Sequence, residues 1–188
     1  MLSPIRTMFL HFPLRAYSTV LVMVLISAYA YKRLKEKWKG GLITRWRGLI
    51  QWALLNYVIA LLFLTVFGRR SQDYYRINLE LLDSYRKAFP NGERLLAKQI
   101  ILNIAAFIPV GFLGTLAPKR FRFPLGLLSG VALSVFIEAM QYLMRNGYCE
   151  ADDLISNILG TIMGCILAGI CVLAKFCAEK YNTSHNPK

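Results

Sequence analysis

Five long apolar runs, separated by basic or polar segments, constrain the fold of this chain more than any other feature. They cover residues 16–31, 48–68, 99–117, 123–144 and 154–174, and only Glu138 interrupts the fourth. Four reach the roughly 20 residues that a helix needs to cross a bilayer. The first is shorter, but Arg15 and Lys32 at its ends can extend to the interface. We expect an all-α, polytopic transmembrane helical bundle with about five membrane-spanning helices.

Composition and charge agree with a membrane protein and argue against nucleic-acid binding. The chain is 56% hydrophobic with a mean hydropathy of +0.42, which is too apolar for a soluble domain of 188 residues. The net charge is +13, yet seven basic residues lie in the short segment 32–47 beside a single acid, Glu36. Basic residues of membrane proteins collect in cytoplasmic loops. No soluble domain remains to carry a nucleic-acid site, so we expect no such partner.

The chain is predicted to form one membrane domain over residues 1–188. Residues 1–47 would be an N-terminal helix and a basic cytoplasmic hairpin, 48–174 the helical core, and 175–188 a polar tail. The sequence Ser27-Ala28-Tyr29-Ala30 resembles a signal-peptidase site. The basic segment that follows would resist translocation, so retention of the first helix is favoured over cleavage.

Orientation follows from the basic residues of the short loops. The segments 32–47 and 118–122 and the C-terminal tail together hold 13 of the 23 Lys and Arg residues. This excess predicts a multi-pass protein of the cell membrane with its N-terminus outside and its C-terminus inside.

The longest polar segment, 68–98, also contains regularly spaced apolar residues. Ile77, Leu81, Tyr85 and Phe89 recur every four residues among charged ones. This spacing predicts an interfacial amphipathic helix. In the third apolar run, Pro109 is expected to kink the helix.

Small residues indicate where helices approach closely. The fourth and fifth runs each contain two glycines four residues apart, a spacing typical of packed membrane helices. These helix-packing candidates are Gly126, Gly130, Gly160 and Gly164.

Acidic residues beside the last two runs point to a site. A carboxylate inside an apolar helix, such as Glu138, costs about 2.5–3.5 kcal/mol on insertion scales and suggests function. Gln141 and Arg145 follow at helical spacing and would share its face. Asp152 and Asp153 open the next helix, and Asn157 lies one turn later.

Residues for familiar metal or covalent chemistry are not evident in the sequence. The four cysteines form no C-x-x-C pair, and His11 and His185 lie near the two ends. There is no Gly-rich phosphate loop. We therefore predict no metal and no cofactor.

Two stretches make the chain similar to the VanZ-like family of membrane proteins. Residues 102–112, LNIAAFIPVGF, match its N-x-x-x-F-x-P-x-G-F pattern, and residues 134–164 match its S-x-x-[IV]-E-x-x-Q motif, Arg, D-D pair and N-x-x-G. Gly68-Arg69 and Asn78-Leu79 fit two further elements, although Leu82-Asp83 replaces the usual Pro-Phe. The resemblance covers about residues 55–170. It implies a link to low-level resistance to the glycopeptide teicoplanin, without a change in the peptidoglycan precursor.

The resemblance and the polar residues together suggest a pocket on the extracytoplasmic side. It would bind or shield a lipid-linked cell-wall component or the glycopeptide, in contact with membrane lipids. Its predicted residues are Arg69, Asn103, Glu138, Gln141, Arg145, Asp152, Asp153 and Asn157.

Three other interpretations stay open. The polar residues could form a purely structural network. Glu138, Asp152 and Asp153 could instead serve a membrane enzyme that modifies an envelope lipid or wall component. The chain could also be a transporter component, although five spans without an internal repeat would need a homodimer to supply enough helices.

Overall fold

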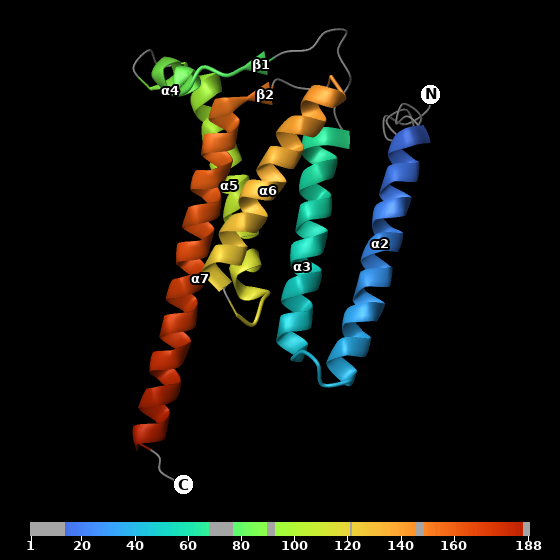
Figure 1. Cartoon of the computed structure of the whole chain (residues 1–188), viewed down its shortest axis with the longest axis vertical. Helices are drawn as coiled ribbons and strands as arrows, with labels where there is room; N and C mark the ends of the chain where they lie inside the picture. The colour runs from blue at the N-terminus through green and yellow to red at the C-terminus, as the bar shows by residue number, and fades with distance from the viewer. Residues whose placement is uncertain (1–13, 68–76, 90–92, 121, 146–148, 186–188) are drawn as a thin grey trace, which may run out of the picture.

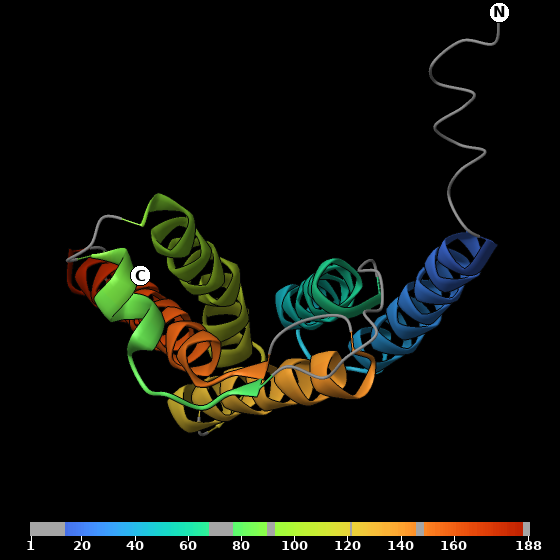
Figure 2. The same ribbon diagram turned by 90° about the horizontal axis from the view of Figure 1, so that it is seen from above.

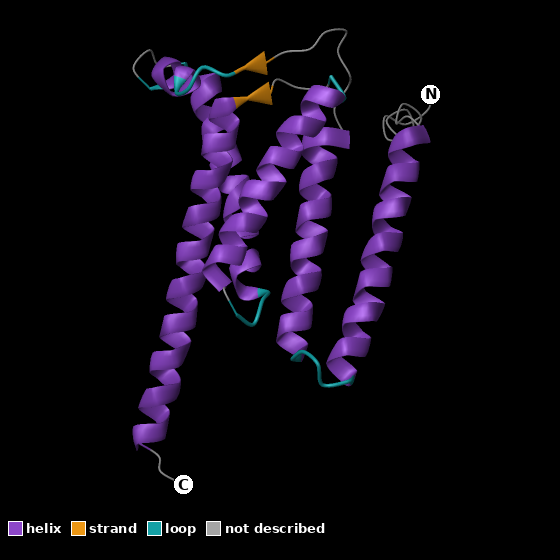
Figure 3. Cartoon of the chain, viewed as in Figure 1, coloured by secondary structure: helices purple, strands orange, loops and turns teal. Residues whose placement is uncertain are grey.

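The computed structural model of the protein describes residues 14–67, 77–89, 93–120, 122–145 and 149–185 (Figure 1). In this part of the chain, five long helices run roughly along one direction. They are α2 (Leu14–Lys39), α3 (Arg45–Leu62), α5 (Arg94–Leu116), α6 (Arg122–Leu143) and α7 (Ala151–His185). Helix is the dominant structure (Figure 3). The shorter elements are the π-helix η1 (Phe63–Phe67), the helix α4 (Asp83–Ala88) and the strands β1 (Ile77–Asn78) and β2 (Cys149–Glu150).

Four stretches of the described chain are long and apolar enough to cross a membrane. They are Arg45–Phe67, Arg94–Leu116, Arg122–Leu143 and Ala151–Tyr181. The remaining long helix, α2, has 26 residues, but its second half is rich in Lys and Arg. The predicted all-α transmembrane bundle of about five helices is confirmed.

Helix continues into two segments that lie beyond the apolar runs. Helix α2 continues to Lys39, so the basic hairpin shortens to a turn at Gly41, where φ is 72°. Helix α7 extends through most of the predicted polar tail to His185. The α2 extension, residues 32–39, is rich in Lys and also contains Arg, Leu and Glu, all of which favour helix, and the α7 extension begins with Lys175 and contains Ala178, Glu179 and Lys180. The pairs Arg33–Glu36 at 3.2 Å and Lys175–Glu179 at 3.8 Å lie on their surfaces.

The predicted amphipathic helix is much shorter than its spacing indicated. Ile77 pairs with Cys149 in a short parallel ladder between β1 and β2, and only Asp83–Ala88 is helical. Leu82 has a left-handed backbone with φ 64°, which ends any helix that would enter from its N-terminal side. Helix α4 then packs against α5 and α7 across one end of the bundle (Figure 2).

Helix α5 forms the centre of the bundle, in contact with α3, α4, α6 and α7. Its close approach to α7 depends on glycine. A Cβ at Gly160 would collide with the carbonyl of Ile104, and one at Gly164 with the carbonyl of Ile108. Between α5 and α6, a Cβ at Gly126 would meet Thr115. Between α6 and α7, a Cβ at Gly130 would meet the side chain of Thr161.

The apolar core lies where α3, η1, α5 and α6 meet. Its buried members are Leu61, Val66, Phe107, Val110 and Ile137. Helix α5 runs through Pro109 as one element.

The two ends of the bundle differ. At one end lie β1, β2 and α4, and we call it the strand end (Figure 1). At the other end lie the α2–α3 turn and the α5–α6 connection, which we call the basic end. Lys119 joins these two loops by donating from Nζ to the carbonyl of Leu42 at 3.1 Å. Helix α2 stands at the edge of the bundle and packs on α3 (Figure 2).

Candidate functional site

Four carboxylates gather at the strand end, and we call them the carboxylate cluster. Glu138 comes from the last turns of α6, Glu150 from β2, and Asp152 and Asp153 from the first turn of α7. Residues 146–148, which connect α6 to β2, lie outside the described residues.

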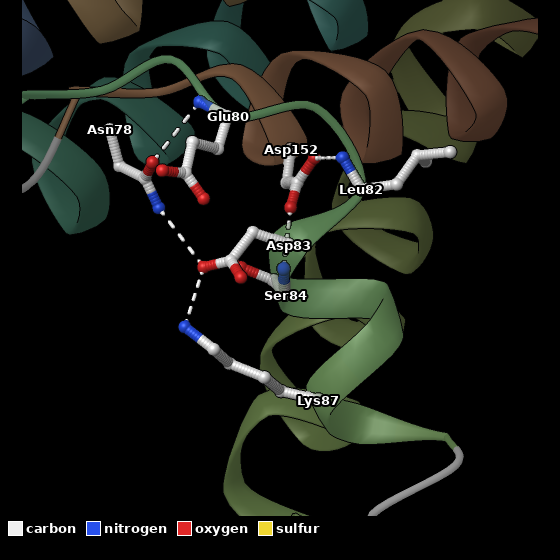
Figure 4. Close-up of polar contacts among 7 residues, drawn as sticks. All are labelled: Asn78, Glu80, Leu82, Asp83, Ser84, Lys87 and Asp152. Carbon is white, nitrogen blue, oxygen red and sulfur yellow. Dashed lines mark hydrogen bonds and ion pairs between the residues drawn. The ribbon is translucent and has the colours of Figure 1, made fainter.

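Asp152 is the anchor of the segment before α4 (Figure 4). Its side chain is buried, and its two oxygens accept hydrogen bonds from the backbone N–H groups of Leu82 at 2.6 Å and Ser84 at 2.7 Å. The carboxylate thus satisfies N–H groups at the start of α4, where a negative charge is stabilised by the helix. Asp152 therefore holds the chain around residue 82 onto the beginning of α7.

The neighbouring contacts of this segment are exposed (Figure 4). Asn78 accepts from the N–H of Glu80 at 3.1 Å, which forms a local turn. Lys87 pairs with Asp83 at 2.7 Å. The hydrogen bond from Lys87 lowers the pKa of Asp83, and the same hydrogen bond raises the pKa of Lys87. Because both groups face solvent, this pair adds little to stability.

Asp153 faces helix α5. Asn103 donates to Asp153 from Nδ2 at 2.7 Å, and Gln99 donates from Nε2 at 3.2 Å. Asn103 was predicted for the site, and the structure brings it together with Asp153. Gln99 was missed, although it precedes Asn103 by four residues and so lies on the same helix face.

Glu138 connects α6 to β2. It is 7% exposed, and its Oε2 accepts from the backbone N–H of Glu150 at 3.2 Å. Glu150 also belongs to the pairing of β2 with β1, where it lies opposite Asn78. A single carboxylate therefore links the fourth apolar helix to the short sheet at the strand end.

Glu150, which we did not predict as a site residue, has a carboxyl whose pKa is raised. It lies just outside the spanning segments. Burial raises the pKa of its carboxyl, and the negative charges of Asp153 and Asp152 raise it further. A hydrogen bond with Ser84 opposes these effects. Three acids within four residues were the available signal in the sequence. A carboxyl in such surroundings holds its proton at higher pH than an ordinary Glu.

Gln141 and Asn157 are both buried and join helices. Gln141 donates from Nε2 to the carbonyl of Thr65 at 3.2 Å, inside the π-helix η1. Asn157 donates to Ser134 Oγ at 2.9 Å, between α7 and α6. Gln141 thus ties α6 to the π-helix, and Asn157 ties α7 to α6.

Of the two predicted arginines, only Arg145 belongs to the described residues. Helix α6 ends at Leu143, and Arg145 follows it with a left-handed φ of 54°. The helical spacing that placed Arg145 on the face of Glu138 therefore does not apply, because the helix ends before it. Arg69 lies outside the described residues.

Hydroxyl groups that the sequence analysis did not consider complete the network. Ser156 bonds the hydroxyl of Tyr85 at 2.7 Å and donates to the carbonyl of Asp152 at 2.8 Å, which ties α4 to α7. Among the described residues, no three His, Cys, Asp or Glu side chains are arranged to hold a metal ion.

The site can act chemically through its carboxyl groups. Their partners include backbone N–H groups, side-chain amides and a hydroxyl. A carboxyl with a raised pKa can donate a proton.

Comparison with known proteins agrees with the motifs. A family model described as VanZ/LLP1 matches residues 52–172, which include α5, α6, the carboxylate cluster and most of α7. Helix α2 lies outside this match. No curated protein and no solved structure matches the chain.

Proposed function

Because this chain belongs to the VanZ/LLP1 family, we propose that it protects the cell envelope against glycopeptides of the teicoplanin type. The proposed site is the strand end of the bundle, facing outward. There it would bind or shield an amphiphile, either a lipid-linked envelope component or the drug.

The observation that carries this proposal is the carboxylate cluster. Glu138 is buried in an apolar helix and accepts from the N–H of Glu150, while burial, and then the charges of Asp153 and Asp152, raise the pKa of Glu150. These four acids lie together at the strand end, beside basic residues such as Arg86 and Lys98. Such a polar surface would contact the head of the amphiphile while its apolar tail lies in the bilayer.

A purely structural role explains part of the cluster. Asp152 has two backbone partners, and Asp153 has two amide partners. We assign Glu138 to function because a carboxylate inside an apolar helix is costly. Glu138→Gln, which keeps an acceptor for the N–H of Glu150, tests this assignment.

The raised pKa of Glu150 supports a second candidate, a membrane enzyme that modifies an envelope lipid or wall component. A carboxyl with a raised pKa can serve as a general acid, with a neighbouring carboxylate as the base. The two candidate functions predict that protection against the drug depends differently on the amount of protein.

The test combines graded expression in a susceptible host with teicoplanin susceptibility and a mass profile of envelope lipids and muropeptides. Binding or shielding predicts protection that rises with protein level and no new modified species. An enzyme predicts protection at low expression and a modified species that disappears in Glu138→Gln. Glu36→Gln, an exposed acid at the basic end, is the matched control and should behave as the parent. No protection at any expression level would refute both.

A further inference from the structure

A groove between α2 and α3 lies apart from the carboxylate cluster. It has a volume of about 470 Å³ and is lined by residues 20–31 of α2 and 52–60 of α3. Its polar groups bond to one another. Ser27 donates to Asn56 Oδ1 at 2.7 Å, and the indole N–H of Trp52 donates to the carbonyl of Ser27 at 3.3 Å. The remaining wall is aliphatic and aromatic, which suits a hydrocarbon chain.

The length and position of the groove fit one leaflet of a bilayer. From Val20 to Tyr31, α2 rises about 16 Å. Half of a typical hydrocarbon core is about 15 Å. The groove ends at the aromatic pair Tyr31 and Trp52, whose ring centroids are 5.6 Å apart, directly before the basic end. Aromatic residues favour this boundary between hydrocarbon and headgroups.

Cations continue the groove face beyond this boundary. Lys35 lies one helical turn after Tyr31, and Arg45 lies two turns before Trp52. Both side chains are exposed, and the guanidinium of Arg45 lies 5.4 Å from the ring centroid of Trp38. They stand about 6–10 Å along the helices from the aromatic pair, where lipid phosphates lie.

We propose that the α2–α3 groove binds an anionic phospholipid of the leaflet at the basic end, with one acyl chain in the groove and its phosphate between Lys35 and Arg45. A second copy of the chain in the same orientation is disfavoured as the occupant. It would bring a second basic segment, with seven cations and one acid, against the first. An anionic lipid instead neutralises these charges.

The test uses the full-length protein in nanodiscs with Trp38→Phe and Trp46→Phe, which leave Trp52 as the only tryptophan. Bromine on an acyl chain quenches its fluorescence on contact. In one series, phosphatidylglycerol with brominated chains is titrated into unbrominated phosphatidylcholine. In the other series, phosphatidylcholine with the same brominated chains is titrated into unbrominated phosphatidylglycerol. The quenching curves give the relative association constant of the two lipids at Trp52.

We expect a preference for phosphatidylglycerol of about 25-fold, which falls by about fivefold in each of Lys35→Gln and Arg45→Gln. Lys98→Gln, at the strand end, is the matched control and should keep the full preference. Ala60→Phe, which fills the groove, should abolish the preference while leaving the helical content unchanged.

Three results would overturn the proposal. The first is equal quenching by both lipids. The second is an equal loss in Lys98→Gln and Lys35→Gln, which would indicate general surface charge. The third is quenching by neither lipid together with disulfide-linked dimers of Val24→Cys, which would place a second copy in the groove.

Discussion

Asp152→Asn tests the connection between α7 and the α4 segment. The carboxylate accepts two short hydrogen bonds, from Leu82 and Ser84, and its side chain is buried. A hydrogen bond to a charged group contributes about 1.5–3 kcal/mol. Asn keeps one acceptor oxygen and turns an NH₂ group toward the other N–H, so one bond is lost and two donors face each other. We expect the docking of this segment to weaken by about 2–3 kcal/mol.

Amide hydrogen exchange measures this loss locally. Since 1.36 kcal/mol is a factor of ten, exchange at Leu82 and Ser84 should accelerate about 30- to 150-fold in Asp152→Asn. Amides in the middle of α5 should change little, because undocking of α4 is a local opening. Glu80→Gln, an exposed acid of the same segment, is the control and should leave both amides protected. Unchanged protection in Asp152→Asn would refute the anchoring role.

Three further predictions concern packing, pH and topology. Gly160→Ala should destabilise the bundle by about 1–3 kcal/mol, because its Cβ would meet the carbonyl of Ile104, whereas Gly169→Ala should be neutral, since nothing lies within 4 Å; unfolding in mixed micelles compares them. The raised pKa of Glu150 means that the folded strand end binds its proton more tightly than the unfolded chain does. Stability should therefore fall as pH rises from the ordinary value of 4.5 through the raised pKa, and Glu150→Gln should flatten this slope in a series of unfolding curves. A reporter that works only in the cytoplasm should be active when fused after Lys188, and activity of a reporter that works only outside the cell would mean that the C-terminus lies outside.

The apolar runs predicted the fold well because membrane helices satisfy all their backbone groups within one segment. Their type and number therefore follow from local sequence. The positions of the helix ends did not follow from the apolar runs, because α2 and α7 continue into the Lys-containing segments beyond these runs.

The strand end shows where such reasoning fails. Leu82 and Ser84 present only backbone N–H groups to Asp152, and a backbone donor has no sequence signature. The pairing of β1 with β2 spans two residues per strand and joins segments about 70 residues apart. It is too short to leave a strand pattern, so the four-residue spacing of Ile77, Leu81 and Tyr85 indicated helix instead.

Spacing within one helix predicted part of the site. Asp153 and Asn157 lie one turn apart on α7, and each finds a partner on a neighbouring helix. Helical spacing did not place Arg145 correctly, because α6 ends two residues before it. The sequence also placed acids together without showing that the pKa of Glu150 would be raised, since its burial depends on how β2 packs at the strand end.

The measurement that tests the central claim most directly is the teicoplanin susceptibility of cells that express Glu138→Gln at the parent's membrane level. Gln keeps an acceptor for the N–H of Glu150, so the fold and the exchange protection of β2 should persist. If the charged strand end is the functional site, these cells should be as susceptible as cells without the protein. Full protection by Glu138→Gln at equal membrane level would contradict the account and assign Glu138 to structure.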